Sequence, residues 1–318
     1  MKFALSTITV GIALALTCHA ASAQNTARTV TVTQQRNGNT SYAEQVAAEF
    51  YADVYTATIT QIGNNNHAGG PGSATGGIVQ RNNGGAGPIA SIYQNGTRNN
   101  AGITQNNNGG SAFTAESRIT QLGNGNAATI RQERNSYVVS TVDQTGDRNV
   151  ATLEQDDSVD TEVHAVQNGT GNRVTISQRG GVYGGPDVIQ NGNANTVSVR
   201  VDGVLGGGPQ ITQTGDLNRA TTSQSGGEAQ LAITQQGTGN RSEVTQTGEV
   251  TIADINQSGN NNLARVSQDI APGNFGFVVA RVNQVGNSNT AIVRQVGQGY
   301  VADVSQIGSR NYASIYQH

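Results

Sequence analysis

A 12-residue pattern that returns about every 22 residues is the feature that most limits how this chain can fold. In its last copy, Gln306 is followed by Gly308 at +2, Asn311 at +5 and Gln317 at +11, with a small residue at +7 and a β-branched residue at +9. Self-similarity at a fixed period decides the architecture before local propensity does. A unit of this length predicts a solenoid, in which each repeat stacks on the one before it.

The pattern occurs ten times, and its four marker positions are held almost throughout. The first glutamines follow at steps of 22 to 27 residues and are Gln94, Gln121, Gln144, Gln167, Gln190, Gln213, Gln235, Gln257, Gln284 and Gln306. The +2 glycines are Gly96, Gly123, Gly146, Gly169, Gly192, Gly215, Gly237, Gly259, Gly286 and Gly308. The +5 asparagines are Asn99, Asn126, Asn149, Asn172, Asn195, Asn218, Asn240, Asn262, Asn289 and Asn311. Nine copies keep the +11 glutamine, at Gln105, Gln132, Gln155, Gln178, Gln224, Gln246, Gln268, Gln295 and Gln317, and Val201 replaces it in the tenth.

Both halves of each repeat alternate between two kinds of residue. Stretches such as 117–121 and 126–132 set small, branched and amide residues at every second position, with varied residues between them. A period of two predicts strands with one buried face, and the glycines permit the positive φ of tight turns. We therefore predict an all-β fold, a β-solenoid of about ten to twelve stacked strand–turn–strand rungs with an amyloid-like cross-β core.

The inward glutamines and asparagines require partners, because burying an amide without one costs about 1–3 kcal/mol. Stacked rungs place identical amides in register, where they form ladders of hydrogen bonds along the axis. The first and last rungs have no neighbour on one side. They are predicted to present open strand edges that template another chain.

The chain divides into three parts. Residues 1–23 resemble a secretory signal, with Lys2, an apolar run and Ala21-Ser22-Ala23 as a cleavage site, which predicts export through the Sec route. Residues 24–87 are predicted to be irregular, with degraded repeats, a helical turn near 43–50 and a long loop or irregular rung at 69–88. Residues 88–318 form the predicted solenoid. The export signal holds the only cysteine and the only lysine, so the mature chain has no disulfide and a charge that falls from −3 to −4.

The repeats resemble the curlin repeat of bacterial curli fibre subunits, in which a Gln-x-Gly-x2-Asn-x-Ala-x3-Gln pattern follows a serine. The resemblance is strong over about 88–317 and weak over 34–68, where Gln34, Asn39 and Gln45 keep the spacing but Arg36 stands in the glycine position. It implies a secreted functional amyloid, or fimbrium, of the cell surface. That protein leaves the periplasm through an outer-membrane curli secretion pore, assembles on a nucleator subunit and serves adhesion, aggregation and biofilm matrix.

Nothing in the sequence predicts catalysis or a cofactor. His67, His164 and His318 are scattered, and the +2 glycines precede no helix, so neither a metal cluster nor a nucleotide site is predicted. Asp156-Asp157, with Asp160 and Glu162 nearby, are favoured as a solvated turn over a cation site. The weakly acidic charge argues against nucleic-acid binding, and no small-molecule substrate is expected.

Acidic residues are unevenly distributed along the repeats. Residues 143–162 hold seven carboxylates against Arg148 alone, a balance of −6. Like charges stacked on adjacent rungs repel, so we interpret these residues as gatekeepers of assembly. We therefore predict that a peptide of residues 284–317 forms fibrils faster than one of residues 144–178, measured by dye binding. A soluble 284–317 peptide beside a fibrillar 144–178 peptide would contradict this.

Two other functions remain open at this point. A soluble β-solenoid enzyme acting on polysaccharide would need clustered carboxylates or Arg/Lys on one face, and none is found to recur at rung spacing. An extracellular ice-binding or adhesin solenoid that stays monomeric would need a flat outward threonine ladder. The outward residue before the first glutamine is instead varied, as at Thr120, Asp143, Ile189, Thr212, Asn256 and Asn283.

Overall fold

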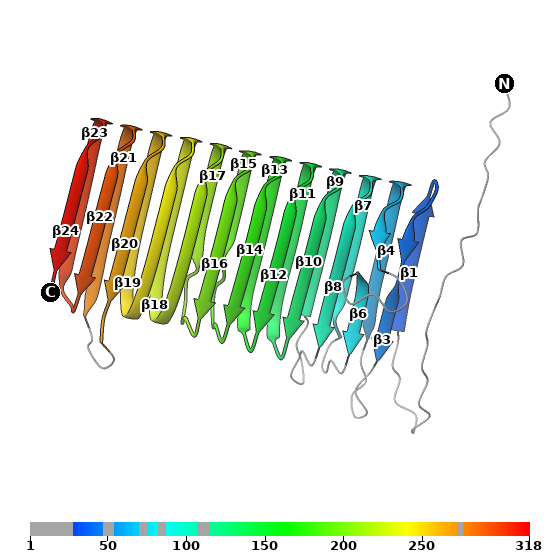
Figure 1. Cartoon of the computed structure of the whole chain (residues 1–318). Coiled ribbons are helices and arrows are strands. Elements are labelled where there is room, and N and C mark those ends of the chain that lie inside the picture. The colour runs from blue at the N-terminus through cyan, green and yellow to red at the C-terminus, as the bar shows by residue number, and fades with distance from the viewer. Residues whose placement is uncertain (1–27, 47–53, 70–75, 82–86, 107–114, 272–275) are drawn as a thin grey trace.

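The computed structural model describes residues 28–46, 54–69, 76–81, 87–106, 115–271 and 276–318, and within these ranges it contains only β-strands, turns and connecting segments. Its 24 strands belong to one continuous hydrogen-bonded sheet that winds into a β-solenoid of about 11 turns. Figure 1 shows the strands stacked along one axis, from β1 at one end to β23 and β24 at the other. The predicted all-β solenoid is confirmed.

Each rung consists of a first strand and a second strand that run in opposite directions. The first strands are β1 (Arg28–Gln35), β4 (Tyr55–Asn64), β7 (Ile89–Thr97), β9 (Ala115–Asn124), β11 (Ser136–Asp147), β13 (Val159–Thr170), β15 (Asp187–Asn193), β17 (Pro209–Asp216), β21 (Phe277–Asn287) and β23 (Tyr300–Ser309). The second strands are β2 (Thr40–Ser41), β3 (Ala43–Val46), β5 (His67–Ala68), β6 (Gly77–Arg81), β8 (Asn100–Asn106), β10 (Ala127–Glu133), β12 (Val150–Asp156), β14 (Arg173–Arg179), β16 (Thr196–Asp202), β20 (Leu263–Asp269), β22 (Thr290–Val296) and β24 (Tyr312–Gln317). Two long strands, β18 (Arg219–Thr238) and β19 (Arg241–Asn260), supply the second strand of one rung and the first strand of the next.

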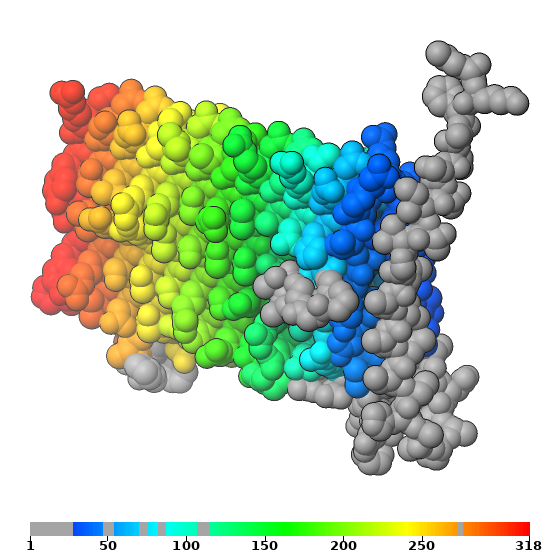
Figure 2. Space-filling model, turned by 45° about the vertical axis from the view of Figure 1, so that its right-hand side comes forward, coloured from blue at the N-terminus to red at the C-terminus, as the bar shows by residue number. Residues whose placement is uncertain are grey.

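Every rung pairs in parallel with the rungs on either side, in the register that the repeat predicts. Gln144 of β11, for example, lies beside Gln121 of β9 and Gln167 of β13. The alternation of side chains then produces a narrow interior in which Ala, Ile, Val, Gln and Asn of both layers are buried. In the space-filling view of Figure 2 the rungs lie side by side across the molecule as successive bands of colour.

The solenoid begins earlier than the sequence predicts. β1 pairs with β4 over its whole length, and β3 pairs with β6, so the rungs start at Arg28 instead of residue 88. Residues 43–46 form β3, so the predicted helical turn is wrong there, while 47–50 lie outside the described residues. Within the 69–88 region, β6 pairs with β3 and β8 and sets Gln80 in the ladder, as an irregular rung would, while residues 70–75 and 82–86 lie outside the described residues. Hydrogen bonds to adjacent rungs outweigh the local Gly-rich composition.

Candidate functional site: axial amide ladders

The first glutamines form one unbroken ladder along the whole column. Gln34, Gln61 and the ten predicted first glutamines are buried or half-buried, and each one before Gln306 donates from its side-chain Nε2 to the Oε1 of the next. All eleven Nε2–Oε1 distances lie between 2.7 and 2.9 Å. The second Nε2 hydrogen of most members goes to a backbone carbonyl of the facing layer, such as Val150 for Gln167. Each buried amide is therefore satisfied by a copy of itself and by the backbone.

The second glutamines form a ladder that breaks at Val201. From Gln45 through Gln80 to Gln178 the Nε2–Oε1 distances lengthen from 2.9 to 3.4 Å. Val201 lies in register between Gln178 and Gln224. Gln178 turns its Nε2 to the Gly184 carbonyl instead, at 3.2 Å. The ladder resumes at Gln224, whose donation to Gln246 measures 2.8 Å.

The asparagines also form a continuous column, but their partners differ in part from the prediction. Each Oδ1 accepts the backbone N–H of the next asparagine at 2.9 to 3.1 Å. Each Nδ2 before the last donates to the carbonyl of the next rung's +2 glycine at 2.7 to 3.0 Å. The predicted amide-to-amide hydrogen bond forms at four steps of the column, at 3.0 to 3.2 Å. Every step also uses the backbone, because the shorter asparagine side chain reaches the backbone of the turn.

The +2 glycines are required for two reasons: their backbone has positive φ, and the next rung leaves no space for a side chain. All ten have φ between 106° and 136°, a region that only glycine adopts readily. A Cβ added to any of the nine glycines that have a following rung would lie 1.9 to 2.2 Å from that rung's glycine carbonyl oxygen. At Gly308, in the last rung, the nearest atom is Asn311 Nδ2 at 3.7 Å. The glycine column therefore sets the close stacking of the turns.

Two features of the same turn, at the +3 and +4 positions, were not predicted from the sequence. At +3, side-chain oxygens accept the preceding rung's backbone N–H, as from Asn124 to Asp147 at 2.9 Å and from Asn193 to Asp216 at 2.8 Å. At +4 the residue is left-handed in every predicted repeat, although only Gly125, Gly171 and Gly239 are glycines there. The recurrence of Asn, Asp and Thr at +3 was the available signal.

The two ends of the column carry unpaired amide groups of opposite kind. At the N-terminal end, Gln45 is 3% exposed and its Oε1 has no hydrogen-bond partner among the described residues. At the other end, Gln306 and Gln317 donate to the backbone carbonyls of Thr290 and Val301, and within the described chain no later glutamine takes their remaining hydrogens. The N-terminal rung thus holds a buried acceptor without a partner among the described residues, and the C-terminal rung carries donors.

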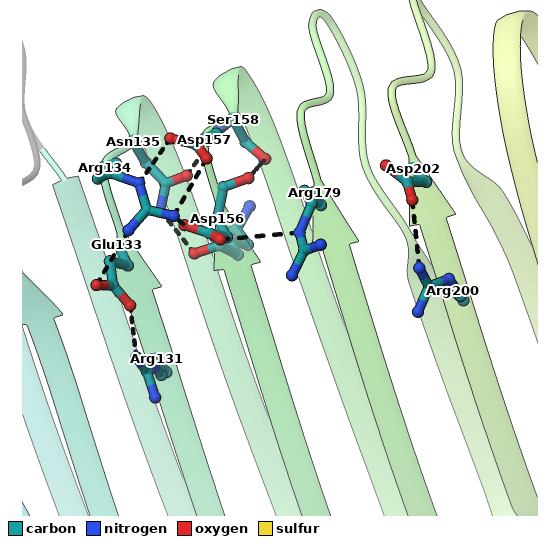
Figure 3. Close-up of polar contacts among 11 residues, drawn as sticks. Arg131, Glu133, Arg134, Asn135, Asp156, Asp157, Ser158, Arg179, Arg200 and Asp202 are labelled. Atoms are coloured by element: carbon teal, nitrogen blue, oxygen red, sulfur yellow. Dashed lines mark hydrogen bonds and ion pairs between the residues drawn. The ribbon is translucent and has the colours of Figure 1, made fainter.

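The charged residues of the middle rungs pair across the stack, as Figure 3 shows. Arg134 contacts Asp156 and Asp157 on the next rung, and its hydrogen bond holds the pKa of Asp157 below the usual range. Arg118 pairs with Asp143 at 3.2 Å. The predicted stacking of like charges is therefore wrong for these acids, because the arginines come from neighbouring rungs outside the 143–162 window.

The scattered histidines and the remaining acids form no metal site in the part of the chain that the structure describes. His164 Nδ1 lies 2.6 Å from the Thr141 hydroxyl, and its Nε2 lies 3.4 Å from Glu162. Asp160, Glu162 and His164 line an open groove of about 350 Å³ together with Tyr183. The same residues include no helix that is long and apolar enough to cross a membrane.

The fold and its inward amides define a class of protein, a parallel β-solenoid with amide ladders along its axis, in which the first and last strands pair on one edge only among the described residues. Comparison with models of known protein families and with curated proteins finds no match. The resemblance to curlin repeats therefore depends on residue spacing alone.

Proposed function

We propose that this chain is a secreted structural subunit that assembles end to end into curli-like extracellular fibres, which serve adhesion, aggregation and biofilm matrix. Its partners would be further copies of itself, a nucleator subunit and an outer-membrane secretion pore. The observation that carries the proposal is the unpartnered, buried Oε1 of Gln45 at one end of a ladder whose other end offers donors. A buried acceptor without a partner costs about 1–3 kcal/mol, which a second copy would recover.

The geometry favours a polar, head-to-tail contact. Gln306 and Gln317 of one copy would donate to Gln34 and Gln45 of the next, as each glutamine already does within the column. Asn311 Oδ1 would accept the backbone N–H of Asn39. Strands β23 and β24 would pair with β1 and β3, since the described residues leave one edge of each unpaired.

The test uses Gly308, whose added Cβ meets no backbone within one copy but would meet the turn of a stacked copy. We expect Gly308→Ala to stay folded, measured by circular dichroism and by amide exchange of the inner rungs, and to elongate at least tenfold more slowly by dye binding. The matched control is Gly299→Ala, in the same terminal rung, because Gly299 also has positive φ and has no atom within 4 Å of its added Cβ. Folded Gly308→Ala that elongates like wild type, or wild type without a 4.8 Å cross-β reflection, would refute the proposal.

A further inference from the structure

The two flat faces of the solenoid carry opposite charge over the same rungs. From β13 onward, the outward residues of the first strands include six carboxylates and one arginine, a balance of −5: Asp160, Glu162, Asp187, Glu228, Asp254, Arg281 and Asp303. We name this surface the acidic face. The outward residues of the second strands include seven arginines and three carboxylates, a balance of +4: Arg173, Arg179, Arg200, Asp202, Arg219, Arg241, Glu243, Arg265, Asp269 and Arg294. We name this surface the basic face.

The basic face includes arginines whose charge the described chain does not neutralise. Arg173 and Arg219 are exposed and form no ion pair with any described residue, whereas Arg265 pairs with Glu243 at 2.7 Å. Arg219 also lies in register beside Arg241 on the next rung. Like charges directly opposite each other in a sheet are destabilising. This arrangement favours an anionic surface that approaches from outside, and it corrects the prediction that arginines do not recur on one face at rung spacing.

The centre of the basic face permits close approach. A column of short hydroxyl side chains enters this face from the preceding rungs: Thr129 and Thr152 lie before it, and Thr175, Ser198 and Thr221 continue the column in register within it. This column was not predicted, because it lies on the second strands, whereas the prediction used the outward residue before the first glutamine. Arginines at the flanking positions, such as Arg173 and Arg200, interrupt any broad threonine array. The surface therefore fits a charged partner better than ice.

We propose that the basic face of one copy packs on the acidic face of another copy, so that assembled columns associate side by side. The inference rests on the proposed function, because one copy offers too little area. Seven rungs of a strand seven residues long span roughly 760 Å² even as a fully covered rectangle, below the ~800 Å² per partner of standard complexes. A fibre repeats the contact along its length and gains avidity. Since the two faces differ, the association is heterologous. Each added column leaves one acidic and one basic face free, so the bundle can keep growing.

The first experiment compares Arg173→Gln/Arg219→Gln with wild type. We expect wild-type fibres to form lateral bundles at about 0.01 M salt, and to disperse at about 1 M salt, where the Debye length is about 3 Å. The double variant should keep the 4.8 Å reflection yet show at least a twofold smaller bundle width by electron microscopy at low salt. The control, Arg98→Gln/Arg148→Gln, removes the same charge from the turn edge and should bundle like wild type.

A second experiment tests complementarity between the faces. Arg173→Glu/Arg219→Glu brings the basic face to zero, and Asp187→Arg/Asp254→Arg/Asp303→Arg brings the acidic face to +1. Neither variant should bundle alone at low salt, while a mixture should bundle, because the unchanged basic face of the second meets the unchanged acidic face of the first.

Several outcomes would overturn lateral pairing while leaving end-to-end assembly intact. They are salt-insensitive bundles, an Arg173→Gln/Arg219→Gln variant that bundles like wild type, and single wild-type fibres whose arginines instead bind alginate as a probe polyanion. Loss of the 4.8 Å reflection in wild type would instead contradict the proposed function itself.

Discussion

Each rung has two turns, so the column has two turn edges. The first-turn edge joins the first and second strands of a rung, and the second-turn edge joins the second strand to the next rung. Both edges come from the same repeat, but they differ in how regularly the same residues recur. At the first-turn edge, every rung from Gln61 onward sets a glutamine, a glycine with positive φ and an asparagine in the same three places. At the second-turn edge, the connections vary in length and the glutamine ladder stretches to 3.4 Å before it breaks at Val201. In the ten predicted repeats, the longer steps result from residues inserted at this second edge, whereas the rung of Gln61 also has an insertion between β5 and β6.

The comparison shows which contacts between rungs the stacking requires and which defects it tolerates. At the first edge, side-chain amides, glycine carbonyls and backbone N–H groups of adjacent rungs are mutually bonded, so a change in one rung affects its neighbours. At the second edge, Gln224 Oε1 and Thr222 Oγ1 are buried without a partner among the described residues, yet the sheet continues past them. The column therefore tolerates a local defect at one edge, while the other edge keeps the rungs in register.

The largest expected loss of stability comes from a substitution that disrupts the first-turn edge. Gly169→Ala places a Cβ 2.0 Å from the Gly192 carbonyl oxygen, and it should lower the free energy of unfolding by more than about 3 kcal/mol through overpacking and strain. Gly171→Ala, two residues away, has no atom within 4 Å of its added Cβ and should cost about 1 kcal/mol, the strain of left-handed backbone. Guanidinium unfolding of freshly purified monomer measures both. Equal losses would show that conformation alone requires the glycine.

The next prediction extends the defect to both edges of one rung. Gln190→Val breaks the first ladder in the rung whose second edge already carries Val201. It removes the acceptor of Gln167 Nε2 and the donor to Gln213 Oε1, which should cost about 2–3 kcal/mol. The outward neighbour serves as control, because Ile189→Thr should change stability by no more than about 0.5 kcal/mol. The unfolding midpoint decides between them. If Gln190→Val costs no more than the control, the first ladder does not hold the rungs.

A repair of the second edge should have a smaller effect of opposite sign. Val201→Gln gives Gln224 Oε1 a donor and Gln178 Nε2 an acceptor, as in the other rungs, and should add about 1 kcal/mol. Amide exchange in β16 should slow in parallel. Lower stability would mean that the turn at Gly184 has adapted to valine and no longer admits the amide.

The smallest expected effect concerns the ion pairs of the second edge. The pKa of Asp157 is lowered first of all by its hydrogen bond from Arg134. Stability from this pair is therefore present above the unfolded pKa of about 3.9 and is lost as the pH falls through the lower folded value. The melting temperature of Arg134→Gln should match wild type at acidic pH and fall slightly below it near neutrality. A difference that persists below the folded pKa would exclude this ionic cause.

Much of the fold could be predicted from the sequence because the signals are local. Alternation predicts strands, and a fixed spacing predicts register, so Gln144 could be placed beside Gln121 and Gln167 without coordinates. The rungs before residue 88 were misjudged because Arg36 occupies a glycine position. Arg36 adopts φ 75°, a conformation that arginine reaches at some cost.

By itself, the sequence determined the solenoid, its period, the inward amides and the glycine turns, since each follows from residue type at a constant interval. Only the tertiary structure decided the direction of the ladders, the backbone partners of the asparagines, the ion pairs between rungs and the opposite charge of the two faces. The physical reason is that these depend on which side chains the winding brings within a few ångströms of each other. The winding and its insertions set those neighbours 22 to 35 residues apart in the chain, so no local pattern identifies them.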